Sequence, residues 1–166
     1  MAASDPSNRS ANHSDHSDLA DPSDPPVGVV VVTHGGAGHC LLAAAGSIVG
    51  PLDSAEAVSV AMEDSFEVVI RHVEQACTDV DHGAGVVILV DIHGSSPFQA
   101  CLAMLDGTRA VEIVCGVNLP MLLKLATVDR RELRPYELAE LLRDVGRRSI
   151  RLGSELTGKI VFQESR

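Results

Sequence analysis

The sequence is poor in aromatic side chains: its 166 residues include no tryptophan, one tyrosine and three phenylalanines. It also lacks a positive balance of charge, because 13 Lys and Arg stand against 23 Asp and Glu, for a formal net charge of −10. Proteins that bind nucleic acid ordinarily present a basic face and aromatic platforms for bases. The composition therefore argues against nucleic acid as a partner and favours proteins or small molecules.

Long apolar runs are also missing, since none approaches the roughly 18 to 20 residues that cross a bilayer. The N-terminus is polar and acidic, unlike the basic and then apolar start of a secretory signal. We therefore expect a cytoplasmic protein with no direct membrane insertion. With 45% hydrophobic residues and a length near the ~150 residues of a typical domain, the chain is expected to bury one core.

Four cysteines are present, and no two of them form a C-x-x-C pair. Cys40, Cys77, Cys101 and Cys115 are widely spaced, which fits neither a disulfide framework nor a zinc knuckle. We expect all four to be reduced and mostly buried, where they behave as small apolar residues.

Residues 1–26 have almost no large aliphatic side chain, Leu19 being the exception after the initiator Met. They carry five Asp and one Arg, which supply −4 of the net charge, and we predict a disordered acidic tail. Such a tail aids solubility or regulates access to an acceptor. Within it, "HSDHSD" at residues 13–18 is better interpreted as a solvated segment than as a metal-binding tract.

From residue 27 onward, apolar runs alternate with helical patterns. Strands are predicted at residues 27–32, 86–90 and 111–116, with a short one at 57–62, and helices at 39–49, 64–77 and about 97–105. Strands that alternate with helices of this length imply crossover connections and a parallel sheet covered on both faces. The predicted fold class is α/β, a single flavodoxin-like domain over residues 27–158.

The C-terminal part has a helical pattern followed by a short apolar run. Five aliphatic residues are predicted to share one helix face, namely Leu138, Leu141, Leu142, Val145 and Leu152. Four arginines lie mostly on other faces, namely Arg143, Arg147, Arg148 and Arg151. The arginines form a solvated face or dock a partner. Residues 159–166 form a separate C-terminal segment, in which "KIVF" at 159–162 is a candidate antiparallel edge strand or exchanged strand.

Polar residues follow two of the predicted buried strands. The first strand ends in Thr33-His34-Gly35-Gly36, and Asp91 follows the strand at 86–90. In a flavodoxin-like sheet strands 1 and 3 lie side by side, so that the histidine and the carboxylate would face each other. A carboxylate that binds one imidazole nitrogen leaves the other with a free lone pair, which makes His34 a candidate nucleophile oriented by Asp91.

The segment Gly94-Ser95-Ser96-Pro97 has the composition of a helix start. A serine suits the N-cap, proline suits the first helical position, and the exposed amides there favour an anion such as a phosphoryl group. Singly, each residue also has a structural interpretation: His34 as a strand-end histidine, Asp91 as a turn former and Ser96 as a cap. The "GGAG" after His34 lacks the Gly-Lys-Ser/Thr ending of a P-loop, which disfavours nucleotide binding of that kind.

Taken together, three segments resemble one family. "VVVTHGGAGHCLL", "VVILVDIHGSSPFQA" and "VEIVCGVNLPMLLKL" are similar in content and order to the mannose-family enzyme IIA domain of the bacterial phosphoenolpyruvate-dependent sugar phosphotransferase system. The resemblance covers about residues 27–152. It implies a cytoplasmic phosphotransferase component that needs no metal, nucleotide or other cofactor.

The resemblance also implies roles for single residues. His34 would accept a phosphoryl group on Nε2 from the carrier protein HPr and pass it to an enzyme IIB-type partner, with Asp91 holding Nδ1–H. Ser96 would contact the phosphate. Supporting or phosphate-binding positions would be Thr33, Gly35, Gly94, Ser95 and Asn118, the last from the Asn-x-Pro-Met signature. Family members are commonly homodimers that exchange a C-terminal strand.

The roles of His93 and His39 and the function of the protein each have more than one interpretation. His93 stands where the family usually has a larger apolar residue, and it either packs in the same way, tunes charge near His34 or acts as a secondary acceptor. His39 and His34 lack a third ligand for a metal site. Alternatives to the transport role are a regulatory sensor of phosphorylation state, a donor to dihydroxyacetone kinase and a small-molecule-binding module. The sequence does not identify a sugar.

Overall fold

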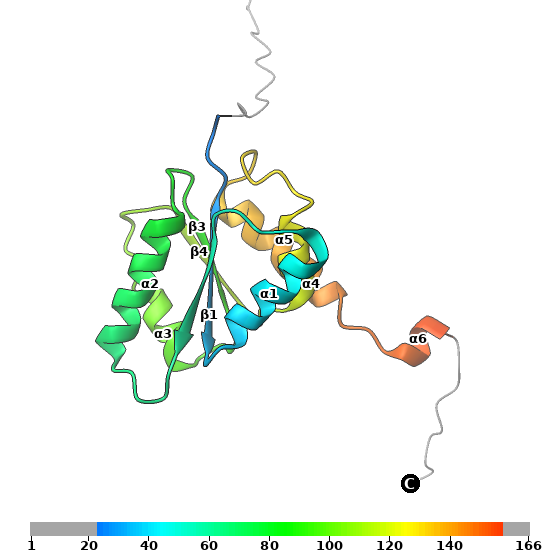
Figure 1. Ribbon diagram of the computed structural model, residues 1–166, viewed down its shortest axis with the longest axis horizontal. Helices are drawn as coiled ribbons and strands as arrows, with labels where there is room; N and C mark the ends of the chain where they lie inside the picture. Colours follow the sequence, from blue (N-terminus) through cyan, green and yellow to red (C-terminus); the bar gives the residue numbers. More distant parts are fainter. Residues whose placement is uncertain (1–22, 158–166) are drawn as a thin grey trace, which may run out of the picture.

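The computed structural model describes residues 23–157 and contains a four-stranded parallel sheet (Figure 1). The strand order is β2-β1-β3-β4, with the strands at Gly28–His34 (β1), Ala55–Val60 (β2), Val86–Val90 (β3) and Val111–Cys115 (β4). All three strand pairs are parallel, which confirms the α/β prediction and the adjacency of the first and third strands. The predicted short strand begins two residues earlier than expected.

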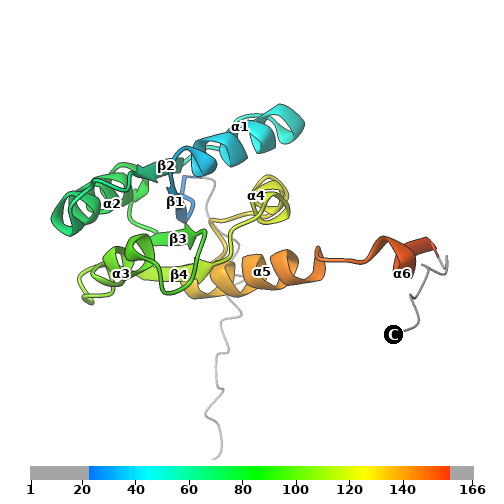
Figure 2. The ribbon, with the colours of Figure 1, turned by 90° about the horizontal axis from the view of Figure 1, so that it is seen from below.

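Helices cover both faces of the sheet. They are α1 (Ala37–Val49), α2 (Phe66–Val80), α3 (Ser96–Leu102), α4 (Leu119–Leu125), α5 (Pro135–Arg148) and α6 (Gly153–Thr157). Figure 2 shows α2 and α3 on one face, and α1, α4 and α5 on the other. Among residues 23–157, no helix has the length and apolarity that crossing a membrane requires. The predicted edge strand at 159–162 and residues 1–22 of the predicted tail lie outside the described residues.

The predicted helices differ from the observed ones in several of their bounds and in number. Helix α2 starts at Phe66 rather than residue 64, because the Ser65 side chain caps it by accepting a hydrogen bond from the Val68 N–H. Helix α3 stops at Leu102, and α4 and α6 were not predicted. Leu152 was wrongly placed on the apolar face of the C-terminal helix, since α5 ends at Arg148 and the Leu152 side chain is 64% exposed.

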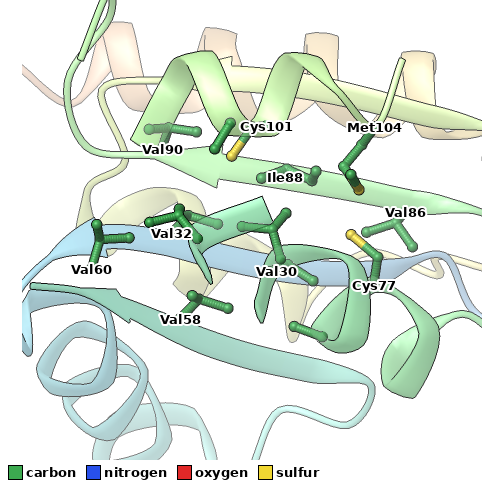
Figure 3. Packing of buried hydrophobic residues seen from close by; sticks show 14 of the residues in the cluster. Val30, Val32, Val58, Val60, Cys77, Val86, Ile88, Val90, Cys101 and Met104 are labelled. Atoms are coloured by element: carbon green, nitrogen blue, oxygen red, sulfur yellow. The ribbon is translucent and has the colours of Figure 1, made fainter. Parts of the chain in front are cut away.

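The buried strands explain why their sequences are apolar without interruption. Alternate residues of β1 point to opposite faces, so that Val30 and Val32 pack toward α2 and α3 while Val29 and Val31 pack toward α1, α4 and α5. Figure 3 shows the first of these two clusters, in which β3 contributes Ile88. Because both faces are covered, all five residues of β3 are buried.

An arginine is buried at the end of the sheet where the strands begin. Arg130 donates hydrogen bonds from Nη1 to the Val27 carbonyl at 2.7 Å and from Nη2 to the Asp53 carbonyl at 2.6 Å. It thereby links the loop between α4 and α5 to the chain entering β1 and β2. The side chain is 8% exposed, and desolvation lowers its pKa. This end of the sheet is therefore fixed by contacts between segments distant in sequence.

We expect Gly85→Ala to destabilise the fold strongly. Gly85 has φ of +84°, and a Cβ there would lie 2.4 Å from the Ala110 carbonyl oxygen and 2.8 Å from Cγ of Pro135. The left-handed conformation and the overpacking together should cost about 2 to 5 kcal/mol. Urea unfolding followed by far-UV circular dichroism measures the loss.

Gly107→Ala is the matched control for this substitution. Its φ is +80°, but a Cβ there would meet no atom within 4 Å. It should cost about 1 to 2 kcal/mol from the backbone conformation alone. Equal losses in the two variants would contradict the close approach at Gly85.

Candidate active site

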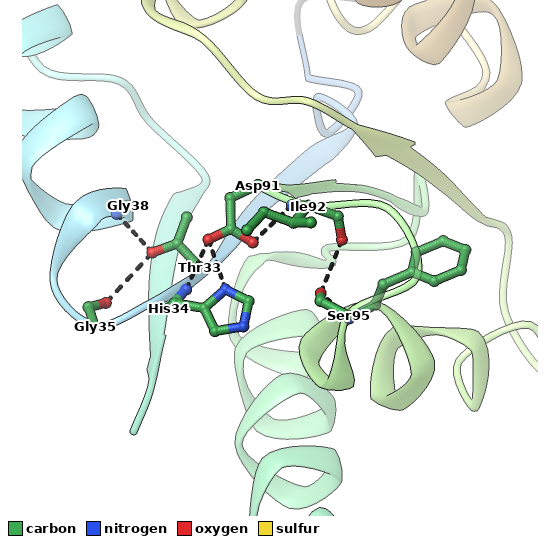
Figure 4. A network of polar contacts seen from close by, with 8 residues as sticks. Thr33, His34, Gly35, Gly38, Asp91, Ile92 and Ser95 are labelled. Atoms are coloured by element: carbon green, nitrogen blue, oxygen red, sulfur yellow. Dashed lines mark hydrogen bonds and ion pairs between the residues drawn. The ribbon is translucent and has the colours of Figure 1, made fainter. Parts of the chain in front are cut away.

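His34 and Asp91 lie side by side at the carboxyl ends of β1 and β3 (Figure 4). Asp91 Oδ2 accepts a hydrogen bond from the His34 backbone N–H at 2.8 Å and lies 2.9 Å from Nδ1 of the same residue. Asp91 Oδ1 accepts from the Ile92 N–H at 2.8 Å. The carboxylate therefore receives bonds on both oxygens and holds the imidazole ring in one orientation.

This geometry fixes the tautomer of the His34 ring. An ionised carboxylate accepts hydrogen bonds and donates none, so the proton belongs on Nδ1 and the lone pair on Nε2. The side chain of His34 is 45% exposed, while that of Asp91 is 21% exposed. The arrangement therefore offers an accessible nitrogen nucleophile backed by a largely covered negative charge.

The charge on Asp91 is stable in this position. Partial burial by itself raises the pKa of the Asp91 carboxyl group. Hydrogen bonds from the backbone N–H and the ring of His34 and from the Ile92 N–H oppose the effect of burial and hold the pKa of Asp91 below its ordinary value. Asp91 is consequently an anion at neutral pH.

Thr33 supports the loop that follows His34. Its buried hydroxyl accepts a hydrogen bond from the Gly38 N–H at 2.7 Å and donates one to the Gly35 carbonyl at 3.3 Å. The Gly35 N–H donates to the Val60 carbonyl of the neighbouring strand at 2.9 Å. Because the Thr33 side chain is fully buried, its geometry fits the supporting role and does not fit contact with a bound phosphate.

We expect Thr33→Val to lower the stability of this loop. The valine leaves the buried Gly38 N–H without an acceptor, a loss of about 1 to 3 kcal/mol in the free energy of unfolding. Thr33→Ser keeps the hydroxyl and serves as the control. Hydrogen exchange at the Gly38 amide should accelerate in the valine variant and stay slow in the serine variant; equal exchange in the two would contradict this role.

The start of α3 differs from the prediction by one residue. Ser95, not Ser96, is the N-cap: its hydroxyl accepts from the Phe98 N–H at 3.3 Å and donates to the Ile92 carbonyl at 2.8 Å. Gly94, with φ of +78°, turns the chain into this position. Ser96 is therefore the first helical residue, with Pro97 after it, and its exposed side chain is not used as the cap.

A hollow of about 300 Å³ lies beside His34. It is bounded by the end of β2, the start of α2 and the start of α3, and its lining is His34, Val60, Ala61, Met62, Asp64, Phe66, Val69, Ser96 and Pro97. Ser96 and His34 thus share one cavity. A larger hollow, of about 680 Å³, surrounds Arg130 at the opposite end of the sheet and contains neither His34 nor Asp91.

The other predicted positions lie around the site without joining it. Asn118 caps α4, where its Oδ1 accepts from the Met121 N–H at 3.4 Å. His93 packs its ring on Phe98 with centroids 5.0 Å apart, in keeping with the packing interpretation. His39 pairs its Nδ1 with the Ser59 hydroxyl at 3.1 Å. Within residues 23–157 no three His, Cys, Asp or Glu side chains are grouped to hold a metal ion.

All four cysteines are free, and two of the four are buried, where the prediction was that they are mostly buried. Cys40 is exposed on α1 and Cys115 is half-buried, while Cys77 and Cys101 are buried. Burial raises the pKa of the Cys77 thiol to about 11 and that of Cys101 to about 12. The two buried thiols are therefore protonated and packed as apolar side chains.

The apolar residues beside His34 escaped the sequence analysis. Met62 and Phe66 line its hollow although their side chains are 100% and 47% exposed. In a sequence, apolar residues such as these predict burial. Their exposure to solvent can therefore be recognised only once the fold is known.

Comparisons with known proteins connect this geometry to a family. The family model described as the PTS system fructose IIA component matches residues 28–140. The PTS system mannose-specific EIIAB component of Escherichia coli (strain K12) is 29% identical over 127 residues, and the chain spans 39% of that protein's length. That alignment covers 75% of this chain.

A second relative and a solved structure extend the likeness. The PTS system fructose-specific EIIA component of Bacillus subtilis (strain 168) is 26% identical over 134 residues, 81% of this chain and 91% of that one. The mannose/sorbose specific IIA subunit of the phosphotransferase system from Enterococcus faecalis has the same fold, with a TM-score of 0.66 and 24% identity over 85% of this chain and 99% of that one. With the family model matching well over half of its residues, the chain belongs to the EIIA-man family of phosphotransferase system components.

Proposed function

We propose that the protein is a phosphocarrier, in which His34 accepts a phosphoryl group on Nε2 from HPr and passes it to an enzyme IIB-type partner. The observation that carries this proposal is the 2.9 Å contact between Nδ1 of His34 and Oδ2 of Asp91. That contact leaves the Nε2 lone pair free and places a counter-charge behind the ring. Membership of the EIIA-man family supports it independently.

The transfer is an in-line displacement at phosphorus. The Nε2 lone pair forms a bond to phosphorus while the donor's bond from nitrogen to phosphorus breaks, and the released electron pair returns to the donor's imidazole. The proton on Nδ1 of His34 stays in place throughout. Because the phosphorylated ring is then cationic, the Asp91 carboxylate stabilises it, and the reverse sequence delivers the phosphoryl group to the acceptor.

The chain's own groups supply the charge stabilisation. Helix α1 begins three residues after His34 and has no acidic residue in its first turn. The Gly38 N–H is already bonded to the Thr33 hydroxyl, so it is the positive end of the helix as a whole that favours an anion here. Ser96 lines the same hollow as His34. We therefore propose transfer without a metal or other cofactor, in the cytoplasm, with Gly35 and Gly94 shaping the loops on either side.

We also propose that the protein acts as a homodimer. Strand β4 has no neighbour on its outer side within residues 23–157, and a hollow of about 440 Å³ runs beside it, lined in part by Phe98, Ile113 and Tyr136. The C-terminal Ile150, Leu152 and Leu156 are all exposed, on a segment that extends away from the sheet (Figures 1 and 2). Sedimentation equilibrium should give twice the chain mass of 17.5 kDa; the single mass would overturn this.

Label transfer tests the proposed carrier function. Radioactive phosphoenolpyruvate, enzyme I and HPr should label the wild-type chain in a form that is stable to base and labile to acid, as a phosphohistidine is. The label should then move to an added enzyme IIB domain. Absence of label, with an HPr that labels a control EIIA, would overturn the proposal, whereas label that reaches no IIB domain would favour a regulatory role or a dihydroxyacetone kinase as acceptor.

A further inference from the structure

The hollow beside His34 contains an acidic side chain that the proposed reaction does not use. Among the described residues that line this hollow, Asp64 is the only acid, and none is a lysine or an arginine. Asp64 lies in the turn between β2 and α2 and is half-buried, whereas Glu63 and Glu67 near it in the sequence are exposed. These lining residues therefore present a carboxylate, and no cation, to a group that occupies the hollow.

Hydrogen bonds hold the Asp64 carboxylate close to the end of β1. Its Oδ2 accepts from the Ala61 N–H at 2.8 Å, and the Asp64 N–H donates to the Ala61 carbonyl at 3.3 Å. Ala61 follows Val60, whose carbonyl accepts a hydrogen bond from the Gly35 N–H at 2.9 Å. Because Gly35 is the residue after His34, these contacts tie the turn that carries Asp64 to the strand that carries the reactive ring.

A phosphoryl group on His34 would share the hollow with this carboxylate. Nδ1 of His34 contacts Asp91, and Figure 4 shows the other ring nitrogen on the side of the ring turned away from Asp91. A group on Nε2 therefore extends away from Asp91, in a hollow that His34, Ser96 and Asp64 line together. Since a phosphoryl group is an anion at neutral pH, its charge has the same sign as that of the Asp64 carboxylate.

We propose that the Asp64 carboxylate destabilises phosphorylated His34 by charge repulsion, and that it thereby makes this chain a stronger phosphoryl donor. This inference rests on the proposed carrier function. The repulsion acts on the phosphorylated chain alone, because the neutral ring of free His34 carries no charge to repel. Asp64 thus opposes the positive end of α1, while Asp91, bonded at Nδ1, stabilises the cationic ring of the phosphorylated histidine.

The position of the transfer equilibrium is sensitive to such a charge. In each transfer one bond from nitrogen to phosphorus forms while another breaks, and the released electron pair returns to the imidazole that is left. The bonds are alike on both sides, so the surroundings of the two histidines decide which one holds the phosphoryl group. A carboxylate about 8 Å from that group, in water-like surroundings, should shift the equilibrium constant about three- to tenfold.

The experiment compares two neutral variants, Asp64→Asn and Asp64→Ser, each of which keeps an oxygen that can accept from the Ala61 N–H. Phosphorylated chain is mixed with HPr after phosphoenolpyruvate and enzyme I have been removed, and intact mass spectrometry gives the phosphorylated fraction of both proteins. The equilibrium constant for phosphorylation of the chain by phosphorylated HPr should rise about three- to tenfold in both variants.

Two further variants are the matched controls. Asp64→Glu keeps the negative charge, and Asp79→Asn removes a charge near the far end of α2, where Asp79 accepts from Gln75. Both should stay within about twofold of wild type. If only one of the two neutral variants folds, as circular dichroism reports, that variant decides the question.

Salt distinguishes charge repulsion from a change in the shape of the turn. The Debye length shortens from roughly 14 Å at about 0.05 M salt to roughly 4 Å at about 0.5 M, so the difference between wild type and the neutral variants should shrink over this range. A difference that does not depend on salt would overturn the inference, as would neutral variants with the wild-type equilibrium constant. Either result leaves the carrier function standing if HPr labels the wild-type chain. A wild-type chain that HPr does not label would overturn both.

Discussion

His34→Gln is expected to accept no phosphoryl group from HPr, with labelling reduced by a factor of at least about 10³. Glutamine has a similar reach and polarity, but its amide nitrogen has no available lone pair to attack phosphorus. The proposed reaction has a single nucleophile, and the structure contains no second imidazole bound to a carboxylate at the end of a strand in residues 23–157. Label incorporation from radioactive phosphoenolpyruvate measures the effect.

His39→Gln and His93→Gln are the matched controls. Both residues are exposed histidines near the end of the sheet that carries His34, and each has a local partner, Ser59 for His39 and Phe98 for His93. Labelling of these variants should stay within about threefold of wild type. Labelling of His34→Gln at the wild-type level would contradict the assignment, and loss of label in His93→Gln alone would identify that residue as the acceptor.

Asp91→Asn is expected to slow phosphoryl acceptance by a factor of about 10² to 10⁴, the range seen when an orienting carboxylate is lost beside a reactive histidine. If the asparagine turns its amide N–H toward Nδ1, the ring must accept there and carry its proton on Nε2, where the attack has to occur. The variant also lacks the charge that stabilises the phosphorylated ring. Asp79→Asn, on the exposed side of α2, removes a comparable charge and should have no such effect.

The same substitution has a pH dependence whose sign follows from the depressed pKa of Asp91. Since the folded-state pKa lies below the ordinary value of 3.8, the carboxylate stabilises the fold fully above pH 3.8, and this stabilisation disappears as the pH falls through the folded-state pKa. Urea midpoints of wild type and Asp91→Asn should differ at pH 7 and converge under acid conditions. A difference that grows as the pH falls would contradict the hydrogen bonds that we assign to this carboxylate.

The sequence was most informative where one physical requirement dominates. The uninterrupted apolar runs of β1 and β3 have one explanation, burial on both faces, and the residues that follow them must meet at one edge of a parallel sheet. This is why His34 and Asp91 could be paired from the sequence. Local hydrogen bonding was less predictable: either of two adjacent serines can cap α3, and tertiary geometry selected Ser95.

Short helices and the solvent exposure of individual apolar side chains were the least predictable features. Helix α4 has seven residues, too few for a periodic pattern, and depends on Asn118 as its cap and on packing against α5. Leu152 fits a helical spacing that the chain no longer follows after Arg148. The exposure of Met62 depends on where the loop after β2 lies, which no local pattern encodes.

The two hydrogen bonds from Arg130 to the Val27 and Asp53 carbonyls have a practical consequence for labelling or immobilising the protein. They fix the end of the sheet at which β1 begins, whereas His34 is the last of the seven residues of that strand. At about 3.3 Å per residue, the entry of the chain and the reactive ring are separated by roughly 20 Å. A tether, fluorophore or immobilising tag attached before residue 23 would thus be joined at the end of the sheet opposite His34 and would leave His34 accessible to the solution.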